Sequence, residues 1–476
     1  MNELNTFSKT KIVCTVGPAS DSKEVLTKLV KAGMDVMRLN FSHGDHPSHK
    51  AKVDLLQEIN QDLGTNVACL LDTKGPEIRT GDFIDGVAQF KNGQVCVLCV
   101  EDIEGTSERF SVSYKQLYKD VKPGGFILID DGQISLLVDH IEGTDIITVC
   151  ANDGVVKNKR GVNVPNVNLK FEYLSQKDID DLVFGCSQPF HFVAASFCRR
   201  AQDIIDIKKI LIANGRPDIQ IIAKIENVEG VANITEILKV ADGVMVARGD
   251  LGVEVPAEEV PFIQKKIIRE AKSLGKVVIT ATQMLESMQN NPRPTRAEVS
   301  DVANAIYDGT DAIMLSGESA NGKYPHESVL MMSRIASFTE ANLDYDNLHA
   351  TAVKTASEGP SEAICMSAAE IAMRFKVAAI IAFTETGYTA RKMSRYRPQA
   401  PIIAATPSMA TMESLSLSWG VKPCSCVSLT TRASMIDYAQ IIAKENNVKS
   451  GELILVTGGT PGLKGDTSYL ELVRVI

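Results

Sequence analysis

Eight apolar runs of strand length recur between residues 11 and 316, and stretches with helical character separate most of them. Most runs are continuously apolar rather than alternating, which is typical of parallel strands covered on both faces. Eight such strands that alternate with helices predict an α/β protein built on a (β/α)8 TIM barrel. The runs occupy residues 11–17, 35–41, 67–73, 192–197, 221–226, 243–247, 277–281 and 312–316.

The interval between the third and fourth runs is too long for one crossover helix. It exceeds a hundred residues and contains repeated turn dipeptides, among them Asn92-Gly93, Asp131-Gly132 and Glu142-Gly143. Such punctuation predicts short strands, so we expect an inserted small β-barrel lid domain. The insertion leaves and re-enters at the C-terminal mouth of the barrel, where a mobile domain could cover an active site.

A third unit is expected after the barrel. Residues 361–376 have a helical pattern, and 377–384, 401–406 and 452–457 have the pattern of strands, which together predict a smaller doubly wound α/β domain. The polar stretch 351–360 is the expected linker. The predicted domains are the catalytic barrel at 1–74 and 172–345, the lid at 75–171, and a C-terminal regulatory domain at 346–476.

Composition narrows the functional class. The chain has 476 residues and a net charge of -9, a poor match to a nucleic-acid-binding protein. It has no apolar run of about 18 residues to span a membrane, and residues 1–10 lack the apolar core of a signal peptide. Ten cysteines are scattered, and strand alternation separates the thiols of Cys96 and Cys99. We therefore expect a cytoplasmic protein that binds neither nucleic acid nor membrane.

The strongest chemical signal is the pair Lys224 and Glu226, which end one expected strand, together with Asp250 after the next strand. Strand side chains alternate faces, so Lys224 and Glu226 point the same way. Two carboxylates with an ammonium beside them form a candidate Mg²⁺ site with a fixed cation, which suits phosphoryl or enolate chemistry.

Other polar residues follow the remaining strands at the same end of the predicted barrel. A charge at one strand end is as readily explained by an ion pair closing the rim, but several that converge on one mouth favour an active site. Arg38 and Lys224 could hold a phosphoryl group, and the oxygens of Asn40, Ser42, Asp72 and Thr73 suit a larger monovalent ion. For His43, His46 and His49 we favour a solvated loop over a zinc site.

The motifs resemble those of the pyruvate kinase family across the barrel and lid, and more loosely beyond. They are MRLNFSHG at 37–44, LDTKGPEIRTG at 71–81, IIAKIENVEG at 221–230, VMVARGDLGVEVP at 244–256, ITATQMLESM at 279–288, NPRPTRAEVSDVANA at 291–305 and DGTDAIMLSGESA at 308–320. The resemblance implies transfer of the phosphoryl group of phosphoenolpyruvate to ADP, giving pyruvate and ATP. It also implies a homotetramer.

The resemblance also implies roles for individual residues. Arg38 would hold the phosphate, and Lys224 would neutralise it in transfer and stabilise the enolate. Glu226 and Asp250 would ligate Mg²⁺ or Mn²⁺, and the amides of Ala247, Gly249 and Asp250 would receive the substrate carboxylate. Thr282 would help to protonate the enolate, with Ser316 as a candidate relay.

Further roles concern potassium, nucleotide and effector. Asn40, Ser42, Asp72 and Thr73 would bind K⁺, and Glu77 matches the members that require it. Arg79, His43 and Asn40 would lie on the nucleotide side, with Arg160, which replaces the usual lysine, as the lid contact. The segment with Thr384, Thr386, Gly387 and Thr389 matches the position of the family's sugar-phosphate effector site, and a helix cap is the alternative.

Two other functional classes remain open at this stage. A phosphoenolpyruvate-using lyase or aldolase would share the metal and enolate logic, although the inserted lid and the Arg38/Lys224 pair favour a kinase. A metabolite sensor that lost its chemistry is disfavoured by Lys224, Glu226, Asp250 and Thr282.

Overall fold

The computed structural model describes residues 7–167, 169–429, 431–459 and 466–476. Its centre is a closed parallel barrel in which the strands follow the order β1-β17-β16-β15-β14-β13-β3-β2. Each of the eight runs singled out in the sequence supplies one strand, so the predicted (β/α)8 barrel is confirmed. The strands are β1 (Lys11–Thr15), β2 (Val36–Asn40), β3 (Ala68–Asp72), β13 (Phe192–Ala195), β14 (Gln220–Ile225), β15 (Gly243–Ala247), β16 (Val277–Ala281) and β17 (Ala312–Leu315).

Helices surround the barrel, and at least two of them begin at side-chain caps. The side chain of Ser22 accepts a hydrogen bond from the Val25 amide, and Thr295 forms a capping box with Glu298. The surrounding elements are α1 (Lys23–Ala32), α2 (His46–Leu63), α4 (Gln176–Cys186), α5 (Ala201–Ala213), α6 (Val228–Ala232), α7 (Ile234–Val240), α8 (Arg248–Glu254), η1 (Ala257–Glu259), α9 (Val260–Ser273), η2 (Glu286–Gln289), α10 (Arg296–Tyr307), α11 (Gly317–Ala320) and α12 (Pro325–Ala341).

The inserted lid is a curled sheet with the order β4-β12-β8-β9-β10-β6-β7, beside the two-stranded sheet β11-β5. Its outer strands are joined by a single bridge between Thr80 and Val112, which brings the sheet close to a barrel. The elements are β4 (Ile78–Arg79), β5 (Val87–Phe90), β6 (Val95–Cys99), β7 (Arg109–Ser111), α3 (Leu117–Asp120), β8 (Phe126–Ile129), β9 (Ile134–Glu142), β10 (Asp145–Cys150), β11 (Gly154–Lys157) and β12 (Gly161–Asn163).

The C-terminal unit is a five-stranded sheet with the order β20-β19-β18-β21-β22, in which only β22 runs antiparallel. Helices α14 and α15 pack on one face and α17 on the other, as in a doubly wound fold. The elements are α13 (Tyr345–Lys354), α14 (Pro360–Arg374), β18 (Ala379–Phe383), α15 (Tyr388–Arg395), β19 (Ile402–Thr406), α16 (Met409–Ser414), β20 (Val421–Ser425), α17 (Arg432–Glu445), β21 (Leu453–Gly458) and β22 (Tyr469–Arg474).

Two details of this unit differ from the expectation. Strands β20 and β22 are interrupted by polar residues and were not among the predicted strands. The expected linker at 351–360 is shorter, because α13 continues to Lys354 and α14 begins at Pro360. The limits assigned to the three domains remain predictions.

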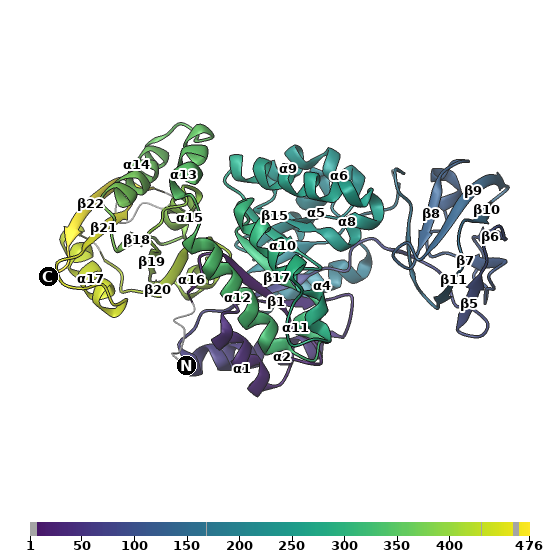
Figure 1. Cartoon of the computed structure of the whole chain (residues 1–476), viewed down its shortest axis with the longest axis horizontal. Coiled ribbons are helices and arrows are strands. Elements are labelled where there is room, and N and C mark those ends of the chain that lie inside the picture. Colours follow the sequence, from purple (N-terminus) through teal and green to yellow (C-terminus); the bar gives the residue numbers. More distant parts are fainter. Residues whose placement is uncertain (1–6, 168, 430, 460–465) are drawn as a thin grey trace.

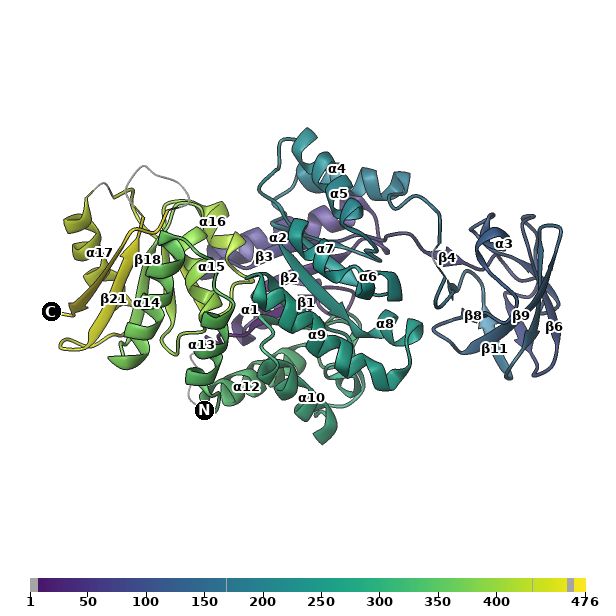
Figure 2. The same ribbon diagram turned by 90° about the horizontal axis from the view of Figure 1, so that it is seen from above.

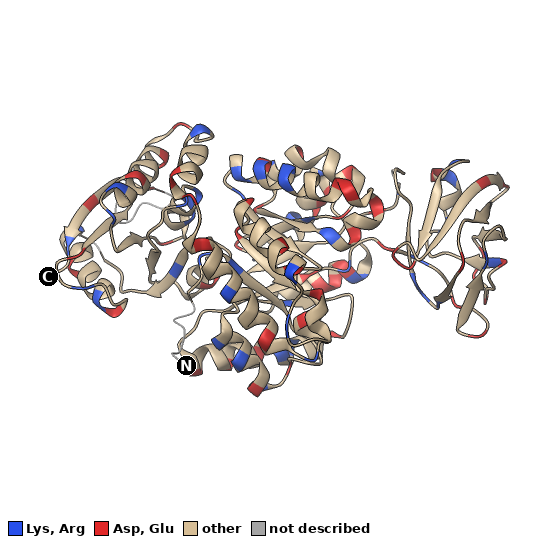
Figure 3. Cartoon of the chain, viewed as in Figure 1, with Lys and Arg blue, Asp and Glu red and all other residues tan. Residues whose placement is uncertain are grey.

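The lid and the C-terminal unit lie on opposite sides of the barrel (Figures 1 and 2). Acidic and basic residues are interspersed over all three units (Figure 3). None of the helices in the described part of the chain is long and apolar enough to span a membrane. All ten cysteines are described and none forms a disulfide.

A residue of the C-terminal unit closes the end of the barrel opposite its C-terminal mouth, which we call the barrel foot. Leu417 is 1% exposed and packs in the same interior cluster as Leu70, Phe192 and Met245. Burial of one leucine side chain contributes roughly 1.5–3 kcal/mol, so this contact helps to hold the two units together.

Replacement of Leu417 by alanine should therefore loosen the attachment of the C-terminal unit. We expect a destabilisation of about 2–5 kcal/mol, because the substitution leaves a cavity at the barrel foot. Urea unfolding followed by circular dichroism measures it. Leu472→Ala, on the half-exposed strand β22, is the matched control and should cost far less. Equal midpoints for the two variants would contradict the role given to Leu417.

Candidate active site

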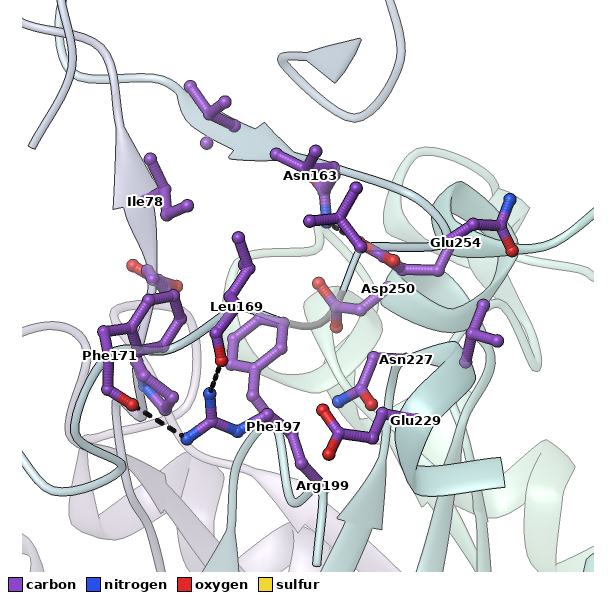
Figure 4. A pocket seen from close by; sticks show the side chains of 18 of the residues that line it. Ile78, Asn163, Leu169, Phe171, Phe197, Arg199, Asn227, Glu229, Asp250 and Glu254 are labelled. Carbon is purple, nitrogen blue, oxygen red and sulfur yellow. Dashed lines mark hydrogen bonds between the residues drawn. The ribbon is translucent and has the colours of Figure 1, made fainter. Parts of the chain in front are cut away.

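A pocket of about 940 Å³ lies between the lid and the C-terminal mouth of the barrel. Asn163 of the lid donates a hydrogen bond to Glu254 of α8 (2.9 Å), which joins the two walls. Arg199 donates to the carbonyls of Leu169 and Phe171 (3.0 and 3.2 Å), where the chain returns from the lid (Figure 4). The lid therefore forms one wall of the pocket, and the mouth of the barrel forms the other.

Lys224 lies near the end of β14 with a side chain that is 10% exposed, and it is not among the residues that line this pocket. Its Nζ is 3.1 Å from Asp72 Oδ1, 2.9 Å from Glu226 Oε1 and 2.7 Å from Ser196 Oγ. Burial opposes the charged form, but Asp72 and Glu226 hold the pKa of Lys224 above its ordinary value. The site therefore contains a cation that stays charged at physiological pH.

Arg38 supplies a second buried cation from β2. Its Nε donates to Asp72 Oδ2 (2.6 Å), and its Nη1 donates to Thr15 Oγ1 (2.7 Å). Burial acts against the charge of Asp72, but Arg38 and Lys224 hold the pKa of its carboxyl below the usual value. One carboxylate thus orients both cations through charge-assisted hydrogen bonds.

Glu226 and Asp250 fit a hard divalent cation. Glu226 is 1% exposed, and its Oε2 accepts a hydrogen bond from the Phe197 amide (2.6 Å). Burial raises the pKa of Glu226 to about 7; Lys224 opposes this rise and the charge of Asp250 adds to it. Two carboxylates that disfavour each other's charge are a suitable donor pair for Mg²⁺ or Mn²⁺. The described residues contain no group of three or more His, Cys, Asp or Glu arranged for a metal.

Asp250, which follows β15, lies in the short helix α8 and projects into the pocket (Figure 4). The Gly249 amide, expected to receive a carboxylate, donates to Thr282 Oγ1 (2.7 Å). Thr282 has φ +68°, which is strained for a β-branched residue and costs roughly 1–3 kcal/mol. The strained residue is thus held directly against the amide at the start of α8.

Arg248 holds the strained turn in place. Its Nη2 and Nε donate to the Thr282 carbonyl (2.7 and 3.2 Å), and its Nη1 forms an ion pair with Asp301 (2.8 Å). The planar guanidinium makes both contacts to one oxygen at once, which a lysine cannot do. Sequence reasoning gave no role to Arg248, although it stands directly before the Gly-Asp pair.

The residues expected to bind K⁺ come from adjacent strands. Asn40 of β2 is paired in register with Asp72 of β3. The Ser42 amide donates to Asn40 Oδ1 (3.0 Å). The hydroxyl of Ser196, not predicted as a site residue, lies 3.0 Å from Asp72 Oδ1 and 2.7 Å from the Thr73 carbonyl. Its position at the end of the fourth apolar run was the signal available in the sequence.

The residues expected on the nucleotide side line the lid pocket but do not form a cluster like that around Lys224. His43, Arg79 and Arg160 all line the pocket. Arg79 forms an ion pair with Glu77 (2.7 Å). Arg160 lies 3.7 Å from Asp130, and its buried Nε has no hydrogen-bond partner among the described residues. This leaves the guanidinium of Arg160 with unused donor capacity at the pocket.

The lid also contributes two carboxylates that the sequence suggested only as a turn. Asp130 and Asp131 have φ of 54° and 56° and line the pocket after β8. Burial, with the charges of Asp250 and Asp130, raises the pKa of Asp131. The Asp-Asp-Gly sequence at a strand end was the available signal.

Two further sets of residues singled out in the sequence are the three histidines after β2 and the effector candidates of the C-terminal unit. The solvated loop expected for the three histidines is wrong for His46 and His49, because both lie in α2 and His49 is buried. His46 pairs with Asp181 (2.7 Å), and His49 contacts the His43 carbonyl (2.9 Å), so these rings make packing contacts. The effector candidates Thr384, Thr386, Gly387 and Thr389 lie between β18 and α15 in the C-terminal unit. Thr389 is buried and its Oγ1 contacts Thr467 Oγ1 (2.8 Å).

Buried cations beside a carboxylate pair, under an inserted lid at a barrel mouth, define the class of metal-assisted barrel enzymes that act on phosphorylated substrates. Models of known families match residues 7–329 as the pyruvate kinase barrel domain and residues 362–475 as the pyruvate kinase alpha/beta domain. The chain belongs to the pyruvate kinase family.

Individual relatives agree over nearly the full length. A pyruvate kinase of Staphylococcus saprophyticus is 51% identical over 468 residues, covering 98% of this chain and 80% of that protein. One from Clostridium perfringens is 49% identical over 475 residues, covering 98% of this chain and 100% of that protein. A crystal structure of a pyruvate kinase from Cryptosporidium parvum superposes with a TM-score of 0.95 at 38% identity, covering 100% of this chain and 97% of that one.

Arg248→Lys tests whether the hydrogen bonds from Arg248 to the Thr282 carbonyl position this strained residue. A lysine keeps the charge but cannot contact the Thr282 carbonyl through two nitrogens, so Thr282 should shift within the site. We expect turnover to fall on the order of 10²-fold with the thermal transition little changed, since small misplacements at a reacting centre have effects of this size. Arg269→Lys, on the exposed face of α9, is the control. Full turnover of Arg248→Lys would contradict the positioning role.

Proposed function

We propose that this enzyme transfers the phosphoryl group of phosphoenolpyruvate to ADP, giving pyruvate and ATP as the last step of glycolysis. The observation that carries the proposal is the buried cluster of Arg38, Asp72, Lys224 and Glu226 at the C-terminal mouth of the barrel. Phosphoryl transfer passes through a loose transition state that needs positioning and charge stabilisation more than covalent help. Two oriented cations beside a metal-binding carboxylate pair supply both.

In the proposed reaction, Arg38 and Lys224 contact the transferring phosphoryl group. An opposite charge at about 4 Å is worth roughly 4 kcal/mol at an effective dielectric near 20, so these two side chains supply much of the stabilisation. After transfer, Lys224 stabilises the enolate oxygen. Thr282 then helps to deliver a proton to the enolate carbon, with Ser316 as a relay.

Glu226 and Asp250 hold Mg²⁺ or Mn²⁺ in this proposal. The bound cation supplies charge neutralisation for the phosphate oxygens. The amides of Ala247 and Asp250 receive the substrate carboxylate, and the Gly249 amide joins them when it exchanges Thr282 Oγ1 for the ligand. The strained Thr282 would then be released from one of its hydrogen bonds.

The proposal extends to the other ligands. Asn40, Ser42, Asp72 and Thr73 bind K⁺, whereas Arg79, His43, Asn40 and Arg160 face the nucleotide. The unused donor of Arg160 supports its role as the lid's phosphate contact in place of a lysine. The segment from Thr384 to Thr389 binds a sugar-phosphate effector.

Assembly and location belong to the same proposal. We infer a homotetramer, supported by the strongly exposed Phe262 on α9 and Phe338 on α12, which a further copy could cover. We also infer a cytoplasmic enzyme, supported by ten unpaired cysteines, most of them buried.

The rival classes are disfavoured. A lyase would not need the nucleotide-facing arginines, and a sensor would not need a buried lysine between carboxylates. A coupled assay of pyruvate release with and without ADP separates the three, because only the kinase requires ADP.

Lys224→Met should fold but lose turnover on the order of 10³-fold or more, since it removes a cation from the transferring phosphoryl group. Steady-state assay with phosphoenolpyruvate and ADP measures the loss, and circular dichroism checks the fold. Lys31→Met, at an exposed position on α1, is the matched control and should keep full activity. A folded Lys224→Met enzyme with near-normal turnover would sink the proposed role.

Potassium dependence gives a second test. Replacing K⁺ by Na⁺ or Tris should lower the activity strongly, because the chain has Glu77 where K⁺-independent members have lysine. Glu77→Lys places a fixed ammonium near this region and should narrow the gap between rates with and without K⁺. Equal wild-type rates in K⁺ and Tris buffers would rule out the requirement.

A further inference from the structure

A second polar cavity, of about 230 Å³, lies at the foot of the barrel, away from the lid pocket. The end of α9 and the start of β16 form its barrel side, and α15 forms its C-terminal side. Figure 3 shows basic residues on α9 towards its end nearest the C-terminal unit. The cavity therefore lies at the interface between the barrel and the C-terminal unit, which we call the seam.

Basic side chains outnumber acidic ones around this cavity. Five cations line it, against the two carboxylates Asp242 and Asp311, which leaves an excess of three positive charges in a chain of net charge -9. The cations are Lys272, Lys276, Arg391, Lys392 and Arg395.

Both carboxylates already have partners. Asp311 accepts from Lys272 (2.9 Å), from Arg397 behind the cavity (2.9 Å) and from the Val278 amide (2.8 Å). Asp242 accepts from the Ile221 amide (2.9 Å). Glu362, also behind the wall, is shared by Lys392 and Arg395. The acidic groups are thus spread over more cations than they can neutralise.

Two guanidinium atoms at this seam lack hydrogen-bond partners. Arg391 Nη1 and Arg395 Nε are buried, and neither meets an acceptor within the described chain. Arg395 is only 8% exposed. A buried donor without an acceptor costs free energy, more so when it is charged. The arrangement therefore has capacity for an additional acceptor.

The titration of the neighbouring groups agrees with this excess of charge. Burial, with the nearby Arg397, lowers the pKa of Lys272 to about 8 even though Asp311 acts against the shift. Burial also lowers the pKa of Lys276 and of Arg391. An anion placed among these groups would favour their charged forms.

We propose that the cavity at the barrel foot binds a small phosphate monoester, which lies between Lys276 of the barrel and Arg391 of α15. A dianionic phosphate offers several oxygens to the two unpartnered atoms, Arg391 Nη1 and Arg395 Nε, and offsets most of the excess charge. The other nitrogens of Arg395 already donate to Glu362 and to the carbonyls of Ser273 and Thr355. This site goes beyond the proposed reaction, because none of the residues assigned to catalysis lines it. Of the segment proposed to bind the effector, only Tyr388 lines the cavity.

The ligand would join the two units. Lys272 and Lys276 belong to the barrel, whereas Arg391 and Arg395 belong to the C-terminal unit. Arg391 also donates to the Thr386 carbonyl, so an anion held by Arg391 is coupled to the segment expected to bind an effector. Binding would stabilise the seam in proportion to ligand saturation.

Isothermal titration calorimetry of the full chain with glycerol 3-phosphate tests the site, with inorganic phosphate as a second probe and glycerol as the uncharged control. The double variant Lys276→Gln/Arg391→Gln should lose one binding event or bind about tenfold more weakly or worse, the effect of removing a charge-assisted hydrogen bond. Arg269→Gln, exposed on α9, is the control and should bind like wild type. Identical isotherms for the double variant and the control would overturn the proposal.

Hydrogen exchange of the wild-type chain gives a readout that does not depend on the variants folding. Glycerol 3-phosphate should protect amides at 272–277 and 388–395 at concentrations that leave the glycerol control unchanged. Protection confined to the lid pocket would overturn the cavity site while leaving the proposed reaction intact. Lys224→Met should keep the protection at the barrel foot, which separates this site from the catalytic one.

Discussion

The ammonium of Lys224, buried between Asp72 and Glu226, is the interaction on which the rest of the site depends. Removing two carboxylates and a lysine from water is costly, and the cluster is tolerable only because each charge is compensated. Asp72 neutralises Lys224 and Arg38 together, and Ser196 and the Phe197 amide satisfy further oxygens. The barrel fixes these groups on adjacent parallel strands, so their geometry follows from strand register rather than from flexible loops.

Beside this cluster, the backbone of Thr282 is strained at the place where we propose that the reaction occurs. Thr282 keeps a left-handed backbone because the Arg248 guanidinium donates to its carbonyl and the Gly249 amide donates to its hydroxyl. Such a conformation persists only when its surroundings determine it fully. The lid adds Asp130, Asp131 and Arg160 to the opposite wall, so the complete pocket exists only when barrel and lid are assembled.

The sequence predicted the barrel well because parallel strands covered on both faces are continuous apolar runs, and all eight were recognisable. Strands β20 and β22 were missed because polar residues interrupt their apolar pattern. At the site, period-two alternation placed Lys224 and Glu226 on one face correctly. Ser196, Arg248 and Asp131 were missed because their roles depend on contacts between segments distant in the chain. A position beside a strand end marks such a residue as a candidate but does not reveal those contacts.

Strand β14 connects the two ends of the barrel in a single short span. Gln220 at its start donates a hydrogen bond to the Ser414 carbonyl of α16 (3.0 Å), and Lys224 stands four residues later at the opposite end. Extended backbone rises about 3.3 Å per residue, so roughly 13 Å of stiff strand separates the two. A shift of α16 would therefore act on the same strand that carries the buried ammonium, so the C-terminal unit is linked to the Lys224 cluster through a single short element.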